Sequence, residues 1–172
     1  YGLRAGDDGD AGAEQVMSLS RGKAFGKGIK RRILFGTHVL SSEQIETVYK
    51  PAQRVRGQVT AEFDAAFEKY DVLISPTTAT PAFKLQERQD PMAMAASDGL
   101  TVSSNLAGNA SASIPVGLTE TGLPVGLQII APRQADDRLY RLGAYLEGKL
   151  QASWGGSLLQ QLPEPMRKAV RS

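Results

Sequence analysis

Two β-prone runs separated by a turn rich in breakers place the strongest constraint on how this 172-residue chain can fold. The runs are Ser113–Gly117 and Val125–Ile130, and Thr121–Pro124 lies between them. Apolar runs bounded by glycine and proline are typical of strands, so the segment predicts two paired strands. Pro115 lies within the first run and has no backbone N–H to donate. We therefore expect that strand to lie at a sheet edge or to carry a bulge.

Helical periodicity covers most of the remaining chain. It predicts helices over residues 13–19, 25–40, 42–70, 91–96, 98–106 and 138–150, and a further strand over residues 71–75. The longest helix should pack along one side of a sheet through its apolar positions. Pro51 lies within it, and proline removes a helical hydrogen bond and clashes with the preceding turn. We therefore expect a kink or break near Tyr49.

The composition is that of an ordinary globular protein, with 41% hydrophobic and 22% charged residues and a net charge of +2. Without cysteine, the chain can form neither a disulfide nor a thiolate metal site, and its one histidine cannot build a metal site alone. No apolar run approaches the roughly 20 residues that span a bilayer. These features predict a cytoplasmic protein that does not associate with a membrane. They indicate no metal-binding residues. One local cluster is basic and is expected to be a solvated helix face: Lys27, Lys30, Arg31 and Arg32.

The segment Asn105–Ile130 resembles the C-terminal half of the amidase signature family, whose members carry an NLAG segment followed by IP(V/C)G and GLPVGLQ(I/F)I strands. Upstream segments resemble, in the same order, the A-subunit family of the glutamyl-tRNA(Gln) amidotransferases. They are KRRILFGT at 30–37, LSS at 40–42, AQRVR at 52–56, FEKYDVL at 67–73 and SPT at 75–77. Ordered matches of this kind are more specific than any single motif. The resemblance covers residues 1–154.

The resemblance implies an α/β fold: the C-terminal part of the amidase signature fold, with a mixed β-sheet covered by helices on both sides. We expect residues 1–154 to form the C-terminal part of an amidase domain and residues 155–172 to form a weakly ordered tail. Since the sequence begins Tyr1-Gly2 without a methionine, it is expected to have been cut from a longer chain. Part of such a sheet would expose an edge and an apolar surface, so the isolated chain should associate or be poorly soluble.

The family's nucleophile machinery, a lysine and two serines, lies in a glycine-rich run of the half that precedes this part. No such run occurs here, so we assign no catalytic residue to this chain. The adjacent serine pairs Ser41–Ser42 and Ser103–Ser104 lie outside any glycine-rich loop, and we interpret both as helix caps or helix-surface residues. We interpret His38 as structural, since a general base needs a nucleophile within reach.

Arg32 and Asp98 are the candidate substrate-binding residues. By the resemblance, Arg32 occupies the position that receives the α-carboxylate of glutamine, and Asp98 the position that receives its α-ammonium. A guanidinium pairs with a carboxylate through two parallel hydrogen bonds, and a carboxylate gives an ammonium a charge-assisted partner. The residues alone favour a surface charge for Arg32 and a helix N-cap for Asp98, and it is the resemblance that favours substrate binding.

The resemblance implies part of a glutaminase (amidase) subunit that releases ammonia for conversion of Glu-tRNA(Gln) to Gln-tRNA(Gln). This chain would supply the glutamine-binding part and would be inactive alone. The implied partners are a tRNA-binding kinase-like B subunit, the small C subunit of the same heterotrimer, and the missing N-terminal half of the glutaminase subunit itself. ATP and magnesium would be used by the kinase-like partner, and no cofactor is expected in this chain. Nothing in the sequence supports direct contact with tRNA.

Two other interpretations stay open at this point. The chain could be a separately encoded, non-catalytic binding or scaffold protein, which would also lack the nucleophile. It could instead be a fragment of a stand-alone amidase for another amide, which would need no clamp for a zwitterion. The presence of both Arg32 and Asp98 favours glutamine. The sequence does not separate glutamine from asparagine as the ammonia donor, or tRNA(Gln) from tRNA(Asn) as the acceptor.

Overall fold

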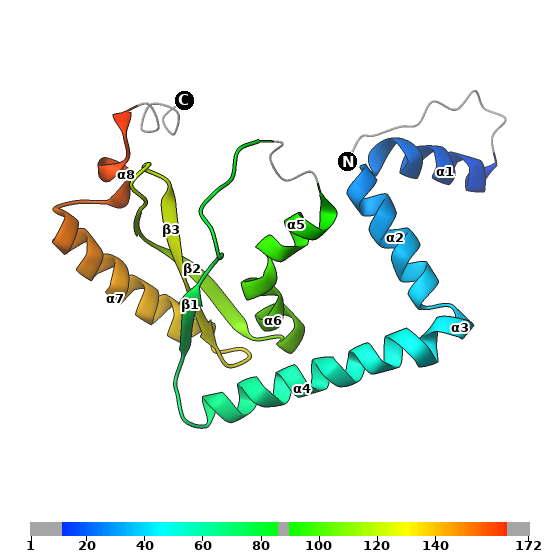
Figure 1. The fold of residues 1–172 in the computed structure, drawn as a ribbon, viewed down its shortest axis with the longest axis horizontal. Helices are drawn as coiled ribbons and strands as arrows, with labels where there is room; N and C mark the ends of the chain where they lie inside the picture. Colours follow the sequence, from blue (N-terminus) through cyan, green and yellow to red (C-terminus); the bar gives the residue numbers. More distant parts are fainter. Residues whose placement is uncertain (1–11, 86–89, 165–172) are drawn as a thin grey trace. The chain divides into compact units, whose positions relative to one another are not determined.

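The computed structural model of the chain describes residues 12–85 and 90–164 (Figure 1). It consists of two compact units, which divide in sequence between Arg54 and Val55. This division lies within one helix, α4 (Lys50–Phe67).

The described elements of the first unit are all helical. Its elements are α1 (Ala13–Ala24), α2 (Lys27–Val39), α3 (Ser42–Gln44), a π-helical turn η1 (Ile45–Tyr49) and the start of α4. The ammonium of Lys30 on α2 donates to the carbonyl of Gly22 on α1 at 2.8 Å, which ties the two helices together. No described residue of this unit is buried, although α1 and α2 carry several apolar side chains. The described residues of this unit therefore form no apolar core among themselves.

Where a kink or break was predicted near Tyr49, the structure has a π-helical turn within a continuous helical segment. Pro51, the second residue of α4, cannot donate to the carbonyl four residues earlier. The turn Ile45–Tyr49 precedes it, and the Lys50 N–H bonds to the carbonyl of Ile45, five residues back. A wider turn of this kind accommodates proline without ending the helix. The segment predicted as one long helix is thus α3, η1 and α4 in succession.

The second unit is built on a three-stranded sheet. Its strands are β1 (Leu73–Pro76), β2 (Ala110–Leu118) and β3 (Pro124–Ala131), in the order β1-β3-β2 (Figure 1). All three predicted strands are present, and both predicted hairpin strands are longer than expected. Both pairings are antiparallel, so the parallel pairing that a mixed sheet requires does not occur among the described strands.

Pro115 has the position that its missing N–H requires. It lies in β2, which is an edge strand of the described sheet, and the register against β3 shifts between Pro115 and Gly117. The predicted edge position and the predicted bulge both occur. The following turn is closed by a bond from the Thr119 N–H to the Leu123 carbonyl at 2.8 Å. Gly122 adopts φ +82° in this turn, a conformation that favours glycine.

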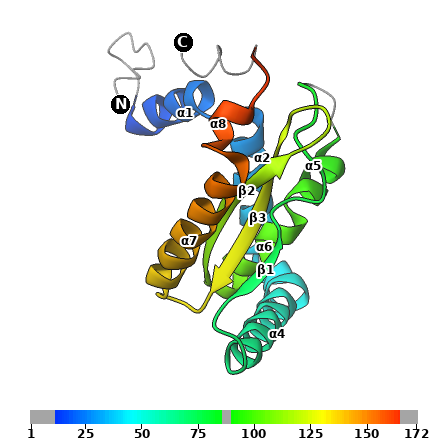
Figure 2. The same ribbon diagram turned by 90° about the vertical axis from the view of Figure 1, so that its left-hand side faces the viewer.

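Helices cover both faces of the sheet, as predicted (Figure 2). On one face lies α7 (Asp136–Trp154), where Ile129, Ala131 and Leu139 form a buried core. Side chains alternate along a strand, so Gln128 points to the opposite face, where it approaches α6 (Gly99–Ala107). This second face also carries α5 (Pro91–Ser97), which leads into α6 (Figure 2). The α/β class is therefore observed.

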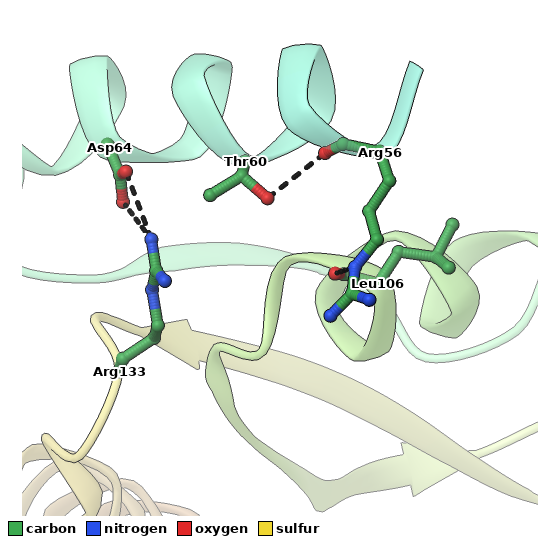
Figure 3. A network of polar contacts seen from close by, with 5 residues as sticks. All are labelled: Arg56, Thr60, Asp64, Leu106 and Arg133. Atoms are coloured by element: carbon green, nitrogen blue, oxygen red, sulfur yellow. Dashed lines mark hydrogen bonds and ion pairs between the residues drawn. The ribbon is translucent and has the colours of Figure 1, made fainter. Parts of the chain in front are cut away.

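The part of α4 in the second unit does not pack into a core, contrary to the prediction for the longest helix. None of its residues is buried. Its attachments are polar (Figure 3): Arg56 donates to the Leu106 carbonyl of α6 at 2.8 Å, and Asp64 pairs with Arg133 at 3.1 Å. Helical periodicity indicates which side chains share a face, but it does not reveal how closely another element approaches that face.

The predicted tail contains one further element, α8 (Leu158–Gln161). The remainder of the tail prediction, at residues 165–172, lies outside the described residues. Within the described ranges, no helix combines the length and apolarity needed to cross a bilayer.

Candidate functional site

Asp98 lies at the junction where α5 ends and α6 begins, and its backbone is fixed there. Its N–H donates to the Ala95 carbonyl at 3.1 Å. Its carbonyl accepts from the N–H groups of Thr101 and Val102, both at 3.0 Å, and from the Thr101 hydroxyl at 3.0 Å. These bonds fix the backbone of Asp98, from which its side chain extends.

The carboxylate of Asp98 makes no capping hydrogen bond, although the residue has the N-cap position of α6. This differs from Asp90, the N-cap of α5, whose carboxylate accepts from the Ala93 N–H at 2.9 Å. Aspartate at an N-cap normally serves the first turn in that way. The Asp98 side chain is exposed, so its carboxylate is available to a ligand. The interpretation of Asp98 as a helix cap accounts for its position but not for its side chain.

Arg32 lies on α2 with its side chain exposed, among the other members of the basic cluster. Arg31 and Lys27 are exposed as well, and Lys30 is bound to Gly22. Because Arg32 belongs to the first unit and Asp98 to the second, their joint action on one ligand stays a prediction. His38 is exposed in the last turn of α2, and its structural role likewise stays a prediction.

The prediction for the second serine pair is wrong at Ser104. Ser41 does take the N-cap position of α3, although its hydroxyl makes no capping bond. Ser104, in contrast, is only 2% exposed within α6. Its hydroxyl donates to the Thr101 carbonyl at 3.0 Å and lies near two polar groups of the sheet. Burial is possible because these partners replace water.

Polar side chains on the α6 face of the sheet were not singled out from the sequence. Thr77 and Ser113 share a short hydrogen bond of 2.6 Å between their hydroxyls, above Gly126 of β3. Gln128 is 2% exposed and donates to the Ser111 hydroxyl at 3.1 Å. The one sequence feature that could have indicated this buried polar group is a glutamine in an otherwise apolar strand. In the described residues no group of three His, Cys, Asp or Glu side chains could hold a metal ion.

Comparison with known proteins places this arrangement in a family. The model of the family described as "Amidase" matches residues 3–140. The chain belongs to the amidase signature family. Among solved structures, the A subunit of glutamyl-tRNA(Gln) amidotransferase from Thermotoga maritima is 32% identical with a TM-score of 0.58, over 77% of this chain and 30% of that protein. A second structure, described only as an amidase, has a TM-score of 0.61 at 22% identity and supports the fold alone.

Curated members of this family are more similar still in sequence. The A subunit of glutamyl-tRNA(Gln) amidotransferase of Thermobifida fusca (strain YX) is 53% identical over 163 residues, which is 94% of this chain and 33% of the relative. The protein of that name from Streptomyces coelicolor is 52% identical over 165 residues, with 95% and 33% covered. This amidase-family chain thus spans about a third of the length of the curated relatives that it matches.

Proposed function

We propose that this chain is the glutamine-binding part of the glutamine-hydrolysing subunit of a glutamyl-tRNA(Gln) amidotransferase, acting in the cytoplasm. The observation that carries the proposal is the 53% identity, over 94% of this chain, to a relative named as the A subunit of that enzyme. A second support is Asp98 at the junction of α5 and α6, where its backbone is hydrogen-bonded and its exposed carboxylate makes no capping bond.

In this proposal Asp98 and Arg32 bind the two charged groups of glutamine. Asp98 accepts hydrogen bonds from the α-ammonium, and Arg32 donates two parallel bonds to the α-carboxylate. With both groups held, the side-chain amide has a fixed direction, and binding is converted into orientation for attack. Simple amides lack both charges and would leave the two residues unpaired, so they would bind poorly.

The attacking serine would come from residues outside this sequence. Hydrolysis consumes glutamine and water and yields glutamate and ammonia. The ammonia would pass to a tRNA-binding, kinase-like subunit that uses ATP and magnesium to activate Glu-tRNA(Gln). A small third subunit would complete a heterotrimer. This chain alone would then be inactive.

Glutaminase assays of the full-length subunit in its complex test this pair of binding residues, Asp98 and Arg32, which we call the clamp. Asp98→Ala and Arg32→Ala should each lower kcat/KM for glutamine about 10- to 100-fold, because a hydrogen bond to a charged group contributes roughly 1.5–3 kcal/mol. Arg31→Ala and Glu147→Ala are matched controls, since both side chains are exposed and neither is assigned to the clamp. Equal kinetics for the Asp98 and Glu147 variants would exclude Asp98 from the site.

A complementation assay tests whether the glutamine-binding residues and the attacking serine lie in different parts of the subunit. This chain should release no ammonia from glutamine alone and should restore activity when mixed with the preceding part of the subunit. If the isolated chain were active, the placement of the nucleophile elsewhere would be contradicted. Failure to complement, with both parts folded, would favour a non-catalytic binding protein instead.

A further inference from the structure

Gln128 is a buried polar side chain whose hydrogen bonds run toward the substrate-binding residue Asp98. It lies in the central strand β3 and is 2% exposed. Its amide nitrogen donates to the Ser111 hydroxyl of β2 at 3.1 Å and lies 3.5 Å from the Ser104 hydroxyl of α6. One side chain therefore joins two strands and a helix.

The contacts continue from Ser104 to the backbone of Asp98. The Ser104 hydroxyl donates to the Thr101 carbonyl at 3.0 Å. The Thr101 N–H and hydroxyl both donate to the Asp98 carbonyl at 3.0 Å. The sheet is thus connected to the N-cap of α6 by hydrogen bonds and one longer polar contact.

The side-chain amide at position 128 supplies donors to both serines of this cluster. Ser104 has a single hydroxyl hydrogen, which is used on Thr101, so toward Gln128 it can only accept. The amide nitrogen of glutamine carries two hydrogens, one for each serine. Methionine has a similar shape but donates nothing. A buried serine oxygen that loses its donor is costly, so α6 would shift to find another partner.

We propose that Gln128 is a positioning residue for glutamine hydrolysis: it sets the placement of α6 on the sheet, and thereby the placement of the Asp98 carboxylate against the α-ammonium of the substrate. This inference rests on the proposed role of Asp98. Gln128 itself does not touch the substrate.

The test compares Gln128→Met with Asp98→Ala in the full-length subunit within its complex, using two substrates. Glutamine carries the α-ammonium, whereas 4-carbamoylbutanoate is the same amide without it. Gln128→Met should raise KM for glutamine about tenfold with kcat nearly unchanged, because a small displacement weakens the ammonium contact. Its kcat/KM for 4-carbamoylbutanoate should equal that of the unmodified enzyme. The control Gln151→Met makes the same change on an exposed turn of α7 and should alter neither value.

The double variant separates positioning from general loss of structure. If Gln128 acts through Asp98, adding Gln128→Met to Asp98→Ala should raise KM no further. An equal loss on both substrates, or additive effects in the double variant, would overturn the inference. The inference would also be overturned if KM for glutamine were unchanged in Gln128→Met while it was raised in Asp98→Ala. An unchanged kcat/KM for glutamine in Asp98→Ala would instead refute the proposed role of Asp98, and the inference with it.

Ser104→Ala tests the same connection with a smaller change if Gln128→Met does not fold. It removes one hydroxyl between Gln128 and Thr101, so the same rise in KM for glutamine and the same constancy with 4-carbamoylbutanoate are expected. Ser104→Ala kinetics equal to those of the unmodified enzyme on glutamine would contradict the connection.

Discussion

At the scale of single residues, Gly126 is a position in the sheet where an added side chain has no space. A Cβ at this position would lie 2.6 Å from the Ser113 hydroxyl oxygen and 2.8 Å from that of Thr77. Both distances are too short, and relieving them would break the hydrogen bond that joins the two hydroxyls. We expect Gly126→Ala to lower the free energy of unfolding by about 1–3 kcal/mol, as overpacking does. Urea unfolding of the full-length protein measures this.

Gly148 provides the matched control for that substitution. It lies within α7, and a Cβ there would meet no atom within 4 Å. Gly148→Ala should raise stability by about 0.5–1 kcal/mol, because alanine is the better helix former. Ser113→Ala combined with Gly126→Ala should recover part of the loss, since it removes the nearer clash. Equal effects of the Gly126 and Gly148 substitutions would show that local space at β3 does not decide the outcome.

At the scale of elements, the π-helical turn is explained by Pro51, which follows it in the chain. Pro51→Ala restores an N–H that can donate to the Thr47 carbonyl, so the wide turn over Ile45–Tyr49 is no longer needed. We expect the segment from Ser42 to Phe67 to become a continuous α-helix, seen as a more negative ellipticity at 222 nm and as slower hydrogen exchange in the turn. Pro81→Ala, in the loop after β1, should change neither. If the π-helical turn persisted without Pro51, contacts other than the proline would be its cause.

The elements also indicate what a sequence reveals at this scale. The interruption near Tyr49 and the bulge at Pro115 were predictable, because each follows from one residue and its own backbone. The burial of Ser104 beside Gln128 was not, because the packing of α6 on the sheet brings together residues that lie 24 positions apart. The position of Asp98 between two helices followed from local pattern. Its free carboxylate did not, since aspartate at that position normally caps its own helix.

At the scale of the whole molecule, the amount of exposed apolar surface is the main feature. The first unit has no buried residue among those described, and its helix α2 exposes Leu34 and Phe35 by 72% and 67%. Ile33 and Leu34 also line a groove of about 570 Å³ with Phe25. In the second unit, β1 and β2 are edges of the described sheet. Surfaces and edges of this kind favour association.

We therefore expect the isolated chain to self-associate, and the apolar side chains of α2 to be a main cause. Sedimentation velocity should give species heavier than a monomer, and Leu34→Lys with Phe35→Ser should shift them toward the monomer. Tyr140→Ser is the matched control, because Tyr140 is 78% exposed but belongs to α7, in the second unit. A single monomeric species that unfolds cooperatively would contradict the expectation, since it would mean that the first unit is stable without any apolar surface covering α2. A shift produced equally by Tyr140→Ser would assign association to general hydrophobicity rather than to α2.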